Sequence, residues 1–438
     1  MLVMQISKVL VVGSGTGGAT VARELAIRGI DVVILERGKY HKLGTERSAM
    51  GFYAGFSSSK FLNLAPGEKS PEGPEILRAF IVGGTSIVTL ANGTRVLQKE
   101  LKSLEIELEE EFKEAEKELG VTPFPEALMG ERTKILKKAS EELGYEVKPM
   151  PKFINFSKCR SCGNCVLGCR YGAKWTAQRY IGEALKAGAK LITEALVEEV
   201  LYSHGEVRGV RVRRPNGTST INADNVVLAA GGIGTPIILQ RSKIGNAGDH
   251  LFADLFVNTY GLVKEGRMRD EVGMATLIDE FHDNHGFILS PILETPLDML
   301  LYLPILKKLR VFKRDRMLGL MTKIADDDSG RVEVDGTIHK PVTRRDQEKL
   351  EMGVEISKKI LSQAGADPKS FYVTRVRGAH LGGTAGIGRV VNTDFETEIH
   401  RLFISDASVL PSAPGAPPVL TIIALSKRFS KKLVSEYL

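Results

Sequence analysis

The sequence predicts an α/β fold in which a parallel sheet is interrupted by an α+β domain and a small cysteine-rich insert. An apolar run leads directly into a glycine-rich turn at residues 9–18, which is typical of a buried parallel strand followed by a helix. All four cysteines lie between positions 159 and 169. Residues 262–373 contain no further glycine-rich turn like the one at residues 9–18. The chain therefore divides into a sheet-forming part, an insert and a second domain.

The composition is that of an ordinary globular protein. The chain has 438 residues, of which 43% are hydrophobic and 26% charged, enough for about two or three domains. The net charge of +7 comes without a basic motif interleaved with aromatic residues, so nucleic acid is not expected as a partner. No apolar run reaches membrane-spanning length, and the first eight residues are too short for a signal peptide. The sequence thus predicts a cytoplasmic protein.

The first glycine turn predicts a dinucleotide site. Gly13 permits the tight turn, Gly15 lets the backbone approach a pyrophosphate, and Gly18 lets the following helix pack closely on the strand. We expect this helix over residues 19–28 and a second strand over 31–35. Glu36 ends that strand, where a carboxylate can bind both ribose hydroxyls. The alternative is an ordinary glycine-rich turn of an α/β protein.

Two further glycine turns follow. Gly83 and Gly84 offer a second point of backbone approach, with the hydroxyls of Thr85 and Ser86 beside it. This segment alone fits a loop as well as a ligand contact. A buried strand at 225–230 runs into a third turn at Gly231, and a helix is expected to about residue 241.

Between these turns, charged and apolar residues alternate at helical spacing. The pattern predicts amphipathic surface helices over 99–119 and 133–143. Residues 189–193 and 197–212 are typical of strands, with a turn near 203–205.

The four cysteines have the spacing C-x2-C-x2-C-x3-C, which is that of a ferredoxin-type iron–sulfur run. The predicted metal ligands are Cys159, Cys162, Cys165 and Cys169. The cluster is 4Fe-4S if Cys169 is a ligand and 3Fe-4S if it is not, and Arg170 stands where proline usually follows. Structural zinc and free or disulfide-bonded cysteines remain alternatives.

Residues 262–373 are interpreted as a substrate domain. Within it, an apolar stretch at 297–306 precedes six basic residues among positions 307–316. One interpretation is a core segment beside a solvated face. The other is an interfacial element that rests on anionic lipid or admits an apolar substrate.

Four segments together resemble the glucose–methanol–choline (GMC) family of flavoprotein oxidoreductases: 13–36, 78–92, 231–245 and 380–421. The cysteine run is similar to that of the subset whose members carry an iron–sulfur cluster. The resemblance implies a Rossmann-like FAD-binding domain, a discontinuous α+β substrate domain and a cluster-binding insert. The implied boundaries are 1–98, 179–261 and 374–438 for the FAD domain, 99–150 for a helical substrate segment, 151–178 for the insert and 262–373 for the substrate domain.

The resemblance also implies a set of FAD contacts. The AMP half is expected on Gly13, Gly15, Gly18 and Glu36, with Arg37 and Gly231 as further cofactor contacts. The diphosphate and isoalloxazine are expected near Gly83, Gly84, Thr85 and Ser86, and Asp406 near the ribityl or diphosphate group. The start of the last helix, at Val419, Leu420 and Thr421, is expected to face the flavin pyrimidine, where a helix N-terminus favours negative charge.

His380 matches the active-site histidine of the family, which takes the hydroxyl proton of an alcohol while hydride passes to flavin N5. A structural histidine in a glycine-rich turn is the alternative. The second active-site position of the family, usually Asn or His, is Pro417 here.

The sequence therefore predicts an FAD-dependent dehydrogenase, rather than an oxidase, that oxidises an alcohol-type substrate. Its cluster would pass electrons to an acceptor protein or quinone, in a multi-subunit complex or at a membrane surface. The alternative is a flavin and iron–sulfur electron-transfer or reductase subunit acting on a C=C bond or quinone, which Pro417 favours.

Overall fold

The computed structural model describes residues 7–42, 68–296, 299–300 and 305–438. Several sequence predictions lie outside these residues. They concern the first six residues and part of the apolar stretch at 297–306.

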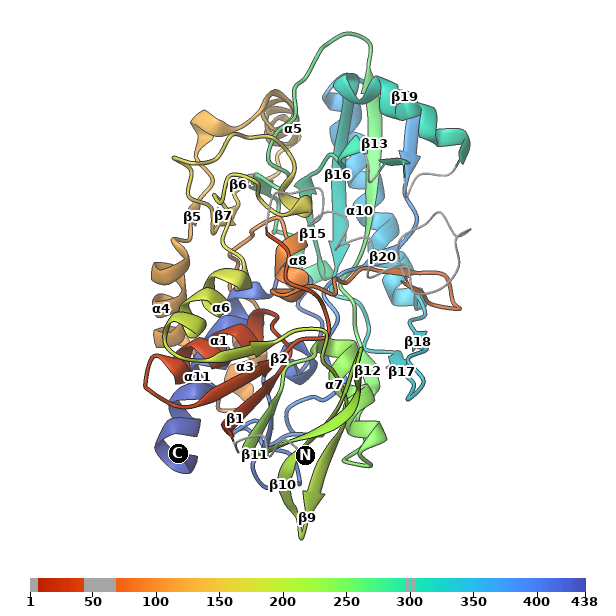
Figure 1. The fold of residues 1–438 in the computed structure, drawn as a ribbon. Helices are drawn as coiled ribbons and strands as arrows, with labels where there is room; N and C mark the ends of the chain where they lie inside the picture. The colour runs from red at the N-terminus through yellow and green to blue at the C-terminus, as the bar shows by residue number, and fades with distance from the viewer. Residues whose placement is uncertain (1–6, 43–67, 297–298, 301–304) are drawn as a thin grey trace.

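A parallel sheet forms the lower half of the molecule in Figure 1, with strand order β8-β2-β1-β11 and β21 paired to β11. Val11 in the central strand pairs with Ile34 on one side and Val227 on the other. The apolar residues of β1 are buried, as the sequence predicted. The bounds are β1 Ser7–Val12, β2 Val32–Leu35, β8 Lys190–Ile192, β11 Gly217–Leu228 and β21 Leu402–Ile404.

The long strand β11 continues beyond this sheet into an antiparallel meander with β10 (Glu206–Arg214) and β9 (Leu196–Ser203). The helix α7 (Gly231–Arg241) packs against β9. The predicted strand pair around 203–205 is thereby confirmed.

On the helical side of the sheet, α1 (Thr16–Ala26) packs between α6 (Ala177–Lys186) and α11 (Val419–Tyr437). The expectation of one helix over 99–119 is wrong. The chain forms α3 (Gln98–Ser103) and α4 (Glu109–Leu119), and Glu105 between them has a φ of 60°. This left-handed conformation cannot continue a right-handed helix. The second amphipathic helix is present as α5 (Glu131–Glu142).

The upper half is built on a second sheet with strand order β15-β16-β13-β20-β4-β3 and β19 paired to β13. The helix α10 (Arg344–Gln363) packs on this sheet and begins with a capping box between Thr343 and Asp346. The bounds are β3 Glu68–Lys69, β4 Glu75–Ile76, β13 Leu255–Val263, β15 Phe287–Pro291, β16 Met317–Ile324, β19 Ala366–Val373 and β20 Arg377–Gly378.

Short elements connect these layers. The remaining strands are β5 Thr122–Pro123, β6 Lys148–Pro149, β7 Pro151–Lys152, β12 Asp249–Leu251, β14 Thr276–Leu277, β17 Gly330–Val332 and β18 Ile338–His339. The short helical turns are η1 Gly84–Val88, η2 Glu126–Leu128, η3 Cys165–Leu167, α8 His282–His285, η4 Ile305–Arg316 and η5 Ala407–Val409.

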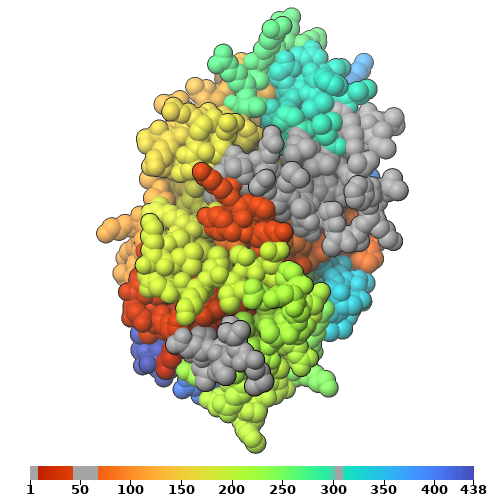
Figure 2. All heavy atoms as spheres, viewed as in Figure 1, coloured from red at the N-terminus to blue at the C-terminus, as the bar shows by residue number. Residues whose placement is uncertain are grey.

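Segments distant in sequence meet on the molecular surface. On the face drawn in Figure 2, early residues in red lie against yellow-green residues from the middle of the chain, in agreement with a hydrogen bond from Glu194 N to Gly38 O (3.3 Å). Within the described part of the chain, no helix is both long enough and apolar enough to cross a bilayer.

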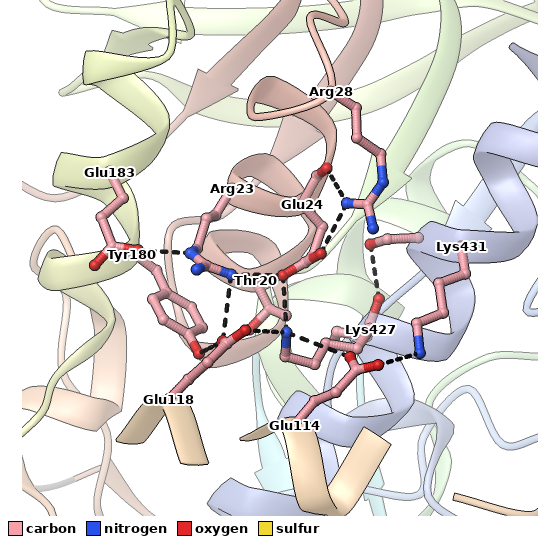
Figure 3. Close-up of polar contacts among 12 residues, drawn as sticks. Thr20, Arg23, Glu24, Arg28, Glu114, Glu118, Tyr180, Glu183, Lys427 and Lys431 are labelled. Carbon is pink, nitrogen blue, oxygen red and sulfur yellow. Dashed lines mark hydrogen bonds and ion pairs between the residues drawn. The ribbon is translucent and has the colours of Figure 1, made fainter. Parts of the chain in front are cut away.

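A buried ion cluster joins the helices of the lower half (Figure 3). Lys427 of α11, whose side chain is 2% exposed, donates hydrogen bonds to Glu24 of α1 and Glu118 of α4, each 2.9 Å long. Arg23 of α1 pairs with Glu118 (3.3 Å) and with Glu183 of α6 (2.6 Å). The cluster therefore links four helices that come from separate parts of the sequence.

We expect Lys427→Met to lower the free energy of unfolding by about 3 kcal/mol, because it leaves buried carboxylates without one of their cations. Chemical denaturation of the purified protein measures the change. Lys113→Met is the matched control, since Lys113 pairs with glutamates on the exposed face of α4 and its loss should not shift the midpoint measurably. Equal midpoints for both variants would contradict a structural role of the cluster.

Candidate active site

Two cavities meet at one histidine between the two halves of the molecule. The first, of about 450 Å³, extends over the carboxyl ends of the parallel strands from Glu36 to Asp406. The second, of about 170 Å³, lies against the second sheet. Thr85, Thr89, Ala379, His380 and Val419 line both cavities. The two cavities therefore adjoin at these five residues.

The first glycine turn shapes the floor of the larger cavity. Gly13 has a φ of 107°, and a Cβ on it would lie 2.2 Å from the carbonyl oxygen of Ala229. A Cβ on Gly18 would lie 2.1 Å from Gly13 O. By contrast, a Cβ on Gly15 would meet no atom within 4 Å, although Gly15 lines the cavity. The turn thus leaves open backbone at the N-terminus of α1, which suits a phosphate group.

Glu36 lies at the end of β2, where the sequence placed it, and is 6% exposed. Its Oε2 accepts hydrogen bonds from Ser14 N (3.0 Å) and Ser14 Oγ (2.6 Å), and Oε1 accepts one from Gly38 N (2.7 Å). Since each carboxylate oxygen can accept two hydrogen bonds, Oε1 keeps capacity for a ligand hydroxyl.

Arg37 lines the same cavity, and its guanidinium lies 3.8 Å from the centre of the Phe80 ring. Burial, with a smaller effect from Arg78, lowers the pKa of Arg37 to about 10. Arg37 stays charged at neutral pH and can face an anionic or aromatic part of a ligand.

The second glycine turn lies directly against the first. Gly83 N donates a hydrogen bond to Ser14 Oγ (3.0 Å), and a Cβ on Gly84 would be 2.9 Å from Gly15 Cα. Ser86 is buried and serves the fold, since its Oγ bonds Gly83 O and receives Ala177 N. Thr85, in contrast, is half-buried and lines both cavities.

Asp406 accepts hydrogen bonds from the third glycine turn, at Gly231. Its Oδ2 accepts hydrogen bonds from Gly231 N (2.8 Å) and Thr235 Oγ1 (2.6 Å), so it orders the first turn of α7. Its Oδ1 accepts from Ser408 N (2.8 Å) and Ser408 Oγ (2.6 Å). Asp406 therefore positions the cavity wall with both carboxylate oxygens.

At the start of α11, the three predicted contacts differ. Val419 lines both cavities. Leu420 and Thr421 are buried, and Thr421 Oγ1 donates a hydrogen bond to Val96 O (3.1 Å). The side chains of Leu420 and Thr421 therefore do not line either cavity, and these residues can offer a ligand only backbone N–H groups.

His380 is fixed by a carboxylate that the sequence analysis missed. Its Nδ1 lies 2.8 Å from Oδ2 of Asp254, which is fully buried, while Oδ1 of Asp254 accepts from Gly415 N (2.8 Å). With Nδ1–H donated to Asp254, the lone pair of the ring is on Nε2, which has no partner within the described part of the chain. The only sequence signal was an isolated acid within the apolar run 251–257.

The electrostatics keep His380 neutral. Burial lowers the pKa of His380 well below its ordinary value, and the charge of Lys323 lowers it further. Burial raises the pKa of Asp254 to about 7. An unprotonated Nε2 is the form that accepts a proton.

Pro417 lies in the wall of the smaller cavity, so the position expected for a second polar group faces that space without one. Its carbonyl oxygen accepts a hydrogen bond from Thr94 Oγ1 (2.8 Å). Polar side chains of this cavity come instead from the second sheet, as Asn258, Lys323 and Arg377, and from Asn92 and Glu294 outside the sheet.

The cysteine loop forms another part of that wall through Gly163 and Val166. Cys165 is buried, while Cys159, Cys162 and Cys169 are half-buried free thiols. Backbone N–H groups point at two sulfurs, from Ser161 to Cys159 Sγ (3.5 Å) and from Ala173 to Cys169 Sγ (3.3 Å). Across the described residues, no three Cys, His, Asp or Glu side chains are gathered closely enough to hold a metal ion.

Two buried lysines flank this loop. Lys174 Nζ donates to the carbonyl oxygens of Ile87 (2.7 Å), Thr89 (2.9 Å) and Cys165 (2.8 Å). Lys152 Nζ donates to Leu90 O, Asn92 Oδ1 and Gly273 O. Burial lowers the pKa of Lys152 to about 7 and that of Lys174 to about 8. The hydrogen-bond acceptors of both lysines are neutral carbonyl and amide oxygens, although buried cations usually have anionic partners.

Comparison with known sequences agrees with this architecture. The amino-terminal part of GMC oxidoreductases matches residues 8–259, and the carboxy-terminal part matches residues 325–426. An uncharacterized protein of Methanocaldococcus jannaschii is 30% identical over 427 residues, which cover 97% of this chain and 99% of the relative. A long-chain-alcohol oxidase of Arabidopsis thaliana is 27% identical over 524 residues, with 98% of this chain and 68% of the relative covered.

Solved structures share the fold. Pyridoxine 4-oxidase from Mesorbium loti superposes with a TM-score of 0.74 at 15% identity, covering 99% of this chain and 100% of that one. A variant of formate oxidase from Aspergillus oryzae gives a TM-score of 0.76 at 15% identity, covering 99% of each chain.

The chain belongs to the GMC oxidoreductase family, and it is an FAD-dependent oxidoreductase with FAD-binding and substrate domains. The residues of the larger cavity fit the cofactor. The open backbone at Gly15 is suited to the diphosphate, and Glu36 keeps an acceptor for a ribose hydroxyl. The smaller cavity then lies where substrate would meet the flavin ring.

Substitutions of Gly15 and Gly17 distinguish a role in cofactor binding from a role in folding. We expect Gly15→Ala to leave the stability of the FAD-free protein unchanged, because its Cβ meets nothing within 4 Å, and to weaken FAD binding at least about tenfold. Gly17→Ala is the matched variant, since its Cβ would lie 1.9 Å from Ser405 O. It should destabilise the FAD-free protein by about 3 kcal/mol. Denaturation and FAD titration of both variants measure these effects, and unchanged FAD affinity in Gly15→Ala would contradict the phosphate assignment.

Proposed function

We propose that this protein oxidises an alcohol-type substrate, with FAD as hydride acceptor and His380 as proton acceptor, and that it is a dehydrogenase rather than an oxidase. The observation that carries the proposal is the position of His380 at the junction of the two cavities, with Nδ1 fixed by Asp254 and Nε2 left for substrate. The similarity to the Arabidopsis long-chain-alcohol oxidase supports an alcohol as substrate.

Each residue has a defined part in this reaction. FAD, when bound, supplies the acceptor for the hydride of the alcohol carbon. Asp254 holds the His380 ring in one orientation, so that Nε2 can accept the hydroxyl proton. The carboxylate also stabilises the imidazolium that forms when the proton arrives. Asp254 is therefore a positioning residue in the proposal, and His380 is the catalytic one.

Pro417 supports a second candidate function. Its side chain cannot orient a hydroxyl, which favours an electron-transfer or reductase subunit that acts on a C=C bond or quinone. The two candidates differ in whether an alcohol reduces the flavin and in whether His380 matters for that step.

We also propose an iron–sulfur cluster on Cys159, Cys162, Cys165 and Cys169, which would supply a one-electron carrier next to the flavin. The spacing, the two N–H···S contacts and the position of the loop at the smaller cavity support it. The buried ammonium groups of Lys152 and Lys174 would offset the negative charge of thiolate ligands. The thiols would have to move together to bind the metal, because they are not gathered in this structure.

The reaction partners belong to the same proposal: a small-molecule substrate and an acceptor protein or quinone. On η4, Leu309 is 71% and Phe312 is 82% exposed within the basic segment. Such residues suit contact with an apolar acceptor at an anionic membrane surface or with another subunit.

The role of His380 is tested by His380→Ala, with His285→Ala on the exposed helix α8 as control. We expect the first variant to retain FAD but to slow anaerobic flavin reduction by a substrate alcohol at least about a hundredfold, because it removes the proton acceptor. Stopped-flow absorbance measures the rate. A parental rate in His380→Ala would favour the electron-transfer function, and fast peroxide formation in air would contradict the dehydrogenase assignment.

Metal analysis tests the cluster. Anaerobically purified protein should contain about four irons per chain, or about three if Cys169 is not a ligand. Cys169→Ser distinguishes these cases, since it should lower the iron content only if Cys169 binds. Stoichiometric zinc without iron, or metal-free thiols, would contradict the proposal.

A further inference from the structure

The smaller cavity contains a buried cation with few partners. Lys323 of β16 is 3% exposed and lines the cavity beside His380. Its Nζ has one long hydrogen bond, 3.4 Å to Asp254 O, and lies 4.8 Å from the centre of the Phe256 ring. No carboxylate of the described residues forms an ion pair with it. An ammonium has three donors, so Lys323 keeps capacity for a ligand.

The nearby carboxylates are already engaged. Both oxygens of Asp254 are used, by His380 Nδ1 and Gly415 N. Asp326 forms a fully buried ion pair with Lys340 (2.9 Å). Among the described residues, Lys323 therefore has no direct ion pair with a carboxylate, in contrast to Lys340.

The other charged side chains of the cavity form a direct ion pair with each other. Arg377 pairs with Glu294 Oε1 at 2.5 Å, and Asn258 Nδ2 donates to the same oxygen (3.2 Å). Because this pair is neutral as a whole, it does not offset the charge of Lys323. Asp254 and Asp326 offset the charge of Lys323 only at longer range than an ion pair. The polar end of the cavity thus offers an ammonium without a direct carboxylate partner, while Val88, Leu90, Ile292 and Met321 give the rest an apolar lining.

One residue, Asp254, contacts both Lys323 and His380. Asp254 contacts Lys323 Nζ through its carbonyl oxygen and His380 Nδ1 through its carboxylate. A ligand whose anionic group lies on Lys323 would therefore place the neighbouring carbon close to His380. The cavity of about 170 Å³ is less than half the volume of the larger cavity, about 450 Å³, so we expect a small ligand.

We infer that the substrate is a small 2-hydroxy acid with a short apolar side chain, whose carboxylate binds Lys323 while its hydroxyl faces His380. This inference rests on the proposed alcohol oxidation and narrows its substrate class. In the reaction, the C2–H bond breaks and the hydride leaves with both electrons to FAD. The hydroxyl proton passes to Nε2 of His380, and the C2–O bond becomes the carbonyl of a 2-oxo acid.

Binding of the carboxylate would also assist the base. Lys323 lowers the pKa of His380, which opposes proton uptake. A carboxylate on Lys323 offsets that charge, so His380 becomes a stronger base when substrate is present. An uncharged alcohol in the same cavity would not have this effect.

The test compares substrates that differ only at the anionic group. Both enantiomers of 2-hydroxybutyrate and 2-hydroxy-4-methylpentanoate are mixed anaerobically with the FAD-loaded protein, against 1,2-butanediol and 4-methyl-1,2-pentanediol. We expect at least one hydroxy acid to reduce the flavin about thirtyfold or more efficiently than its diol. Equal or faster reduction by the diols would overturn the inference and leave alcohol oxidation intact.

The variant Lys323→Met should remove this preference, whereas Lys323→Arg keeps the charge and should retain part of it. FAD content shows whether each variant is folded. Binding is measured separately, by titrating 2-oxobutyrate into the oxidised protein and following the flavin absorbance. The Kd should rise about thirtyfold or more in Lys323→Met.

The two failures are distinguishable. If 2-oxobutyrate binds in a Lys323-dependent manner but no alcohol or hydroxy acid reduces the flavin, the anion site stands and the proposed oxidation fails. If 2-oxobutyrate does not perturb the flavin, or binds Lys323→Met equally well, the anion site is wrong.

Discussion

Close backbone contact at the carboxyl edge of the parallel sheet is the constraint on which the rest of the structure depends. Gly13 lies against Ala229, Gly17 lies against Ser405, and a side chain at either glycine would enter the neighbouring carbonyl group. These contacts set β1, β11 and β21 so close together that Asp406 can order the first turn of α7. The cofactor cavity lies above the carboxyl ends of these strands.

The sequence predicted features that depend on neighbouring residues. The first glycine turn, its flanking strands and the second amphipathic helix follow from local patterns, and the structure confirms them. It did not predict Asp254 or Lys323, because their importance arises from contacts across the fold. The hydrogen bond between Asp254 and His380 joins residues 126 positions apart. Buried charges within apolar strands are visible in the sequence, but their partners are not.

The surroundings of the cysteine loop, too, could not be predicted from the sequence. The spacing of its cysteines predicts a set of metal ligands without reference to distant residues. The environment of the loop comes only from the fold, which places Lys152 and Lys174 in the interior and brings η3 against η1 near the second glycine turn. A redox group on this loop would lie at the wall of the smaller cavity, since Val166 lines that cavity together with His380.

The contact between α1 and α11 has a consequence for synthesis of the protein. Lys427 binds Glu24 across 403 positions, so the first and last helices of the cofactor domain meet only after nearly the whole chain exists. Until β21 and α11 have left the ribosome, the sheet has an unpaired edge at β11 and α1 lacks one neighbour. The part of the cofactor cavity that Asp406 and Val419 line therefore forms only after these carboxy-terminal segments have folded, and until then the β11 edge is open to pairing with another strand.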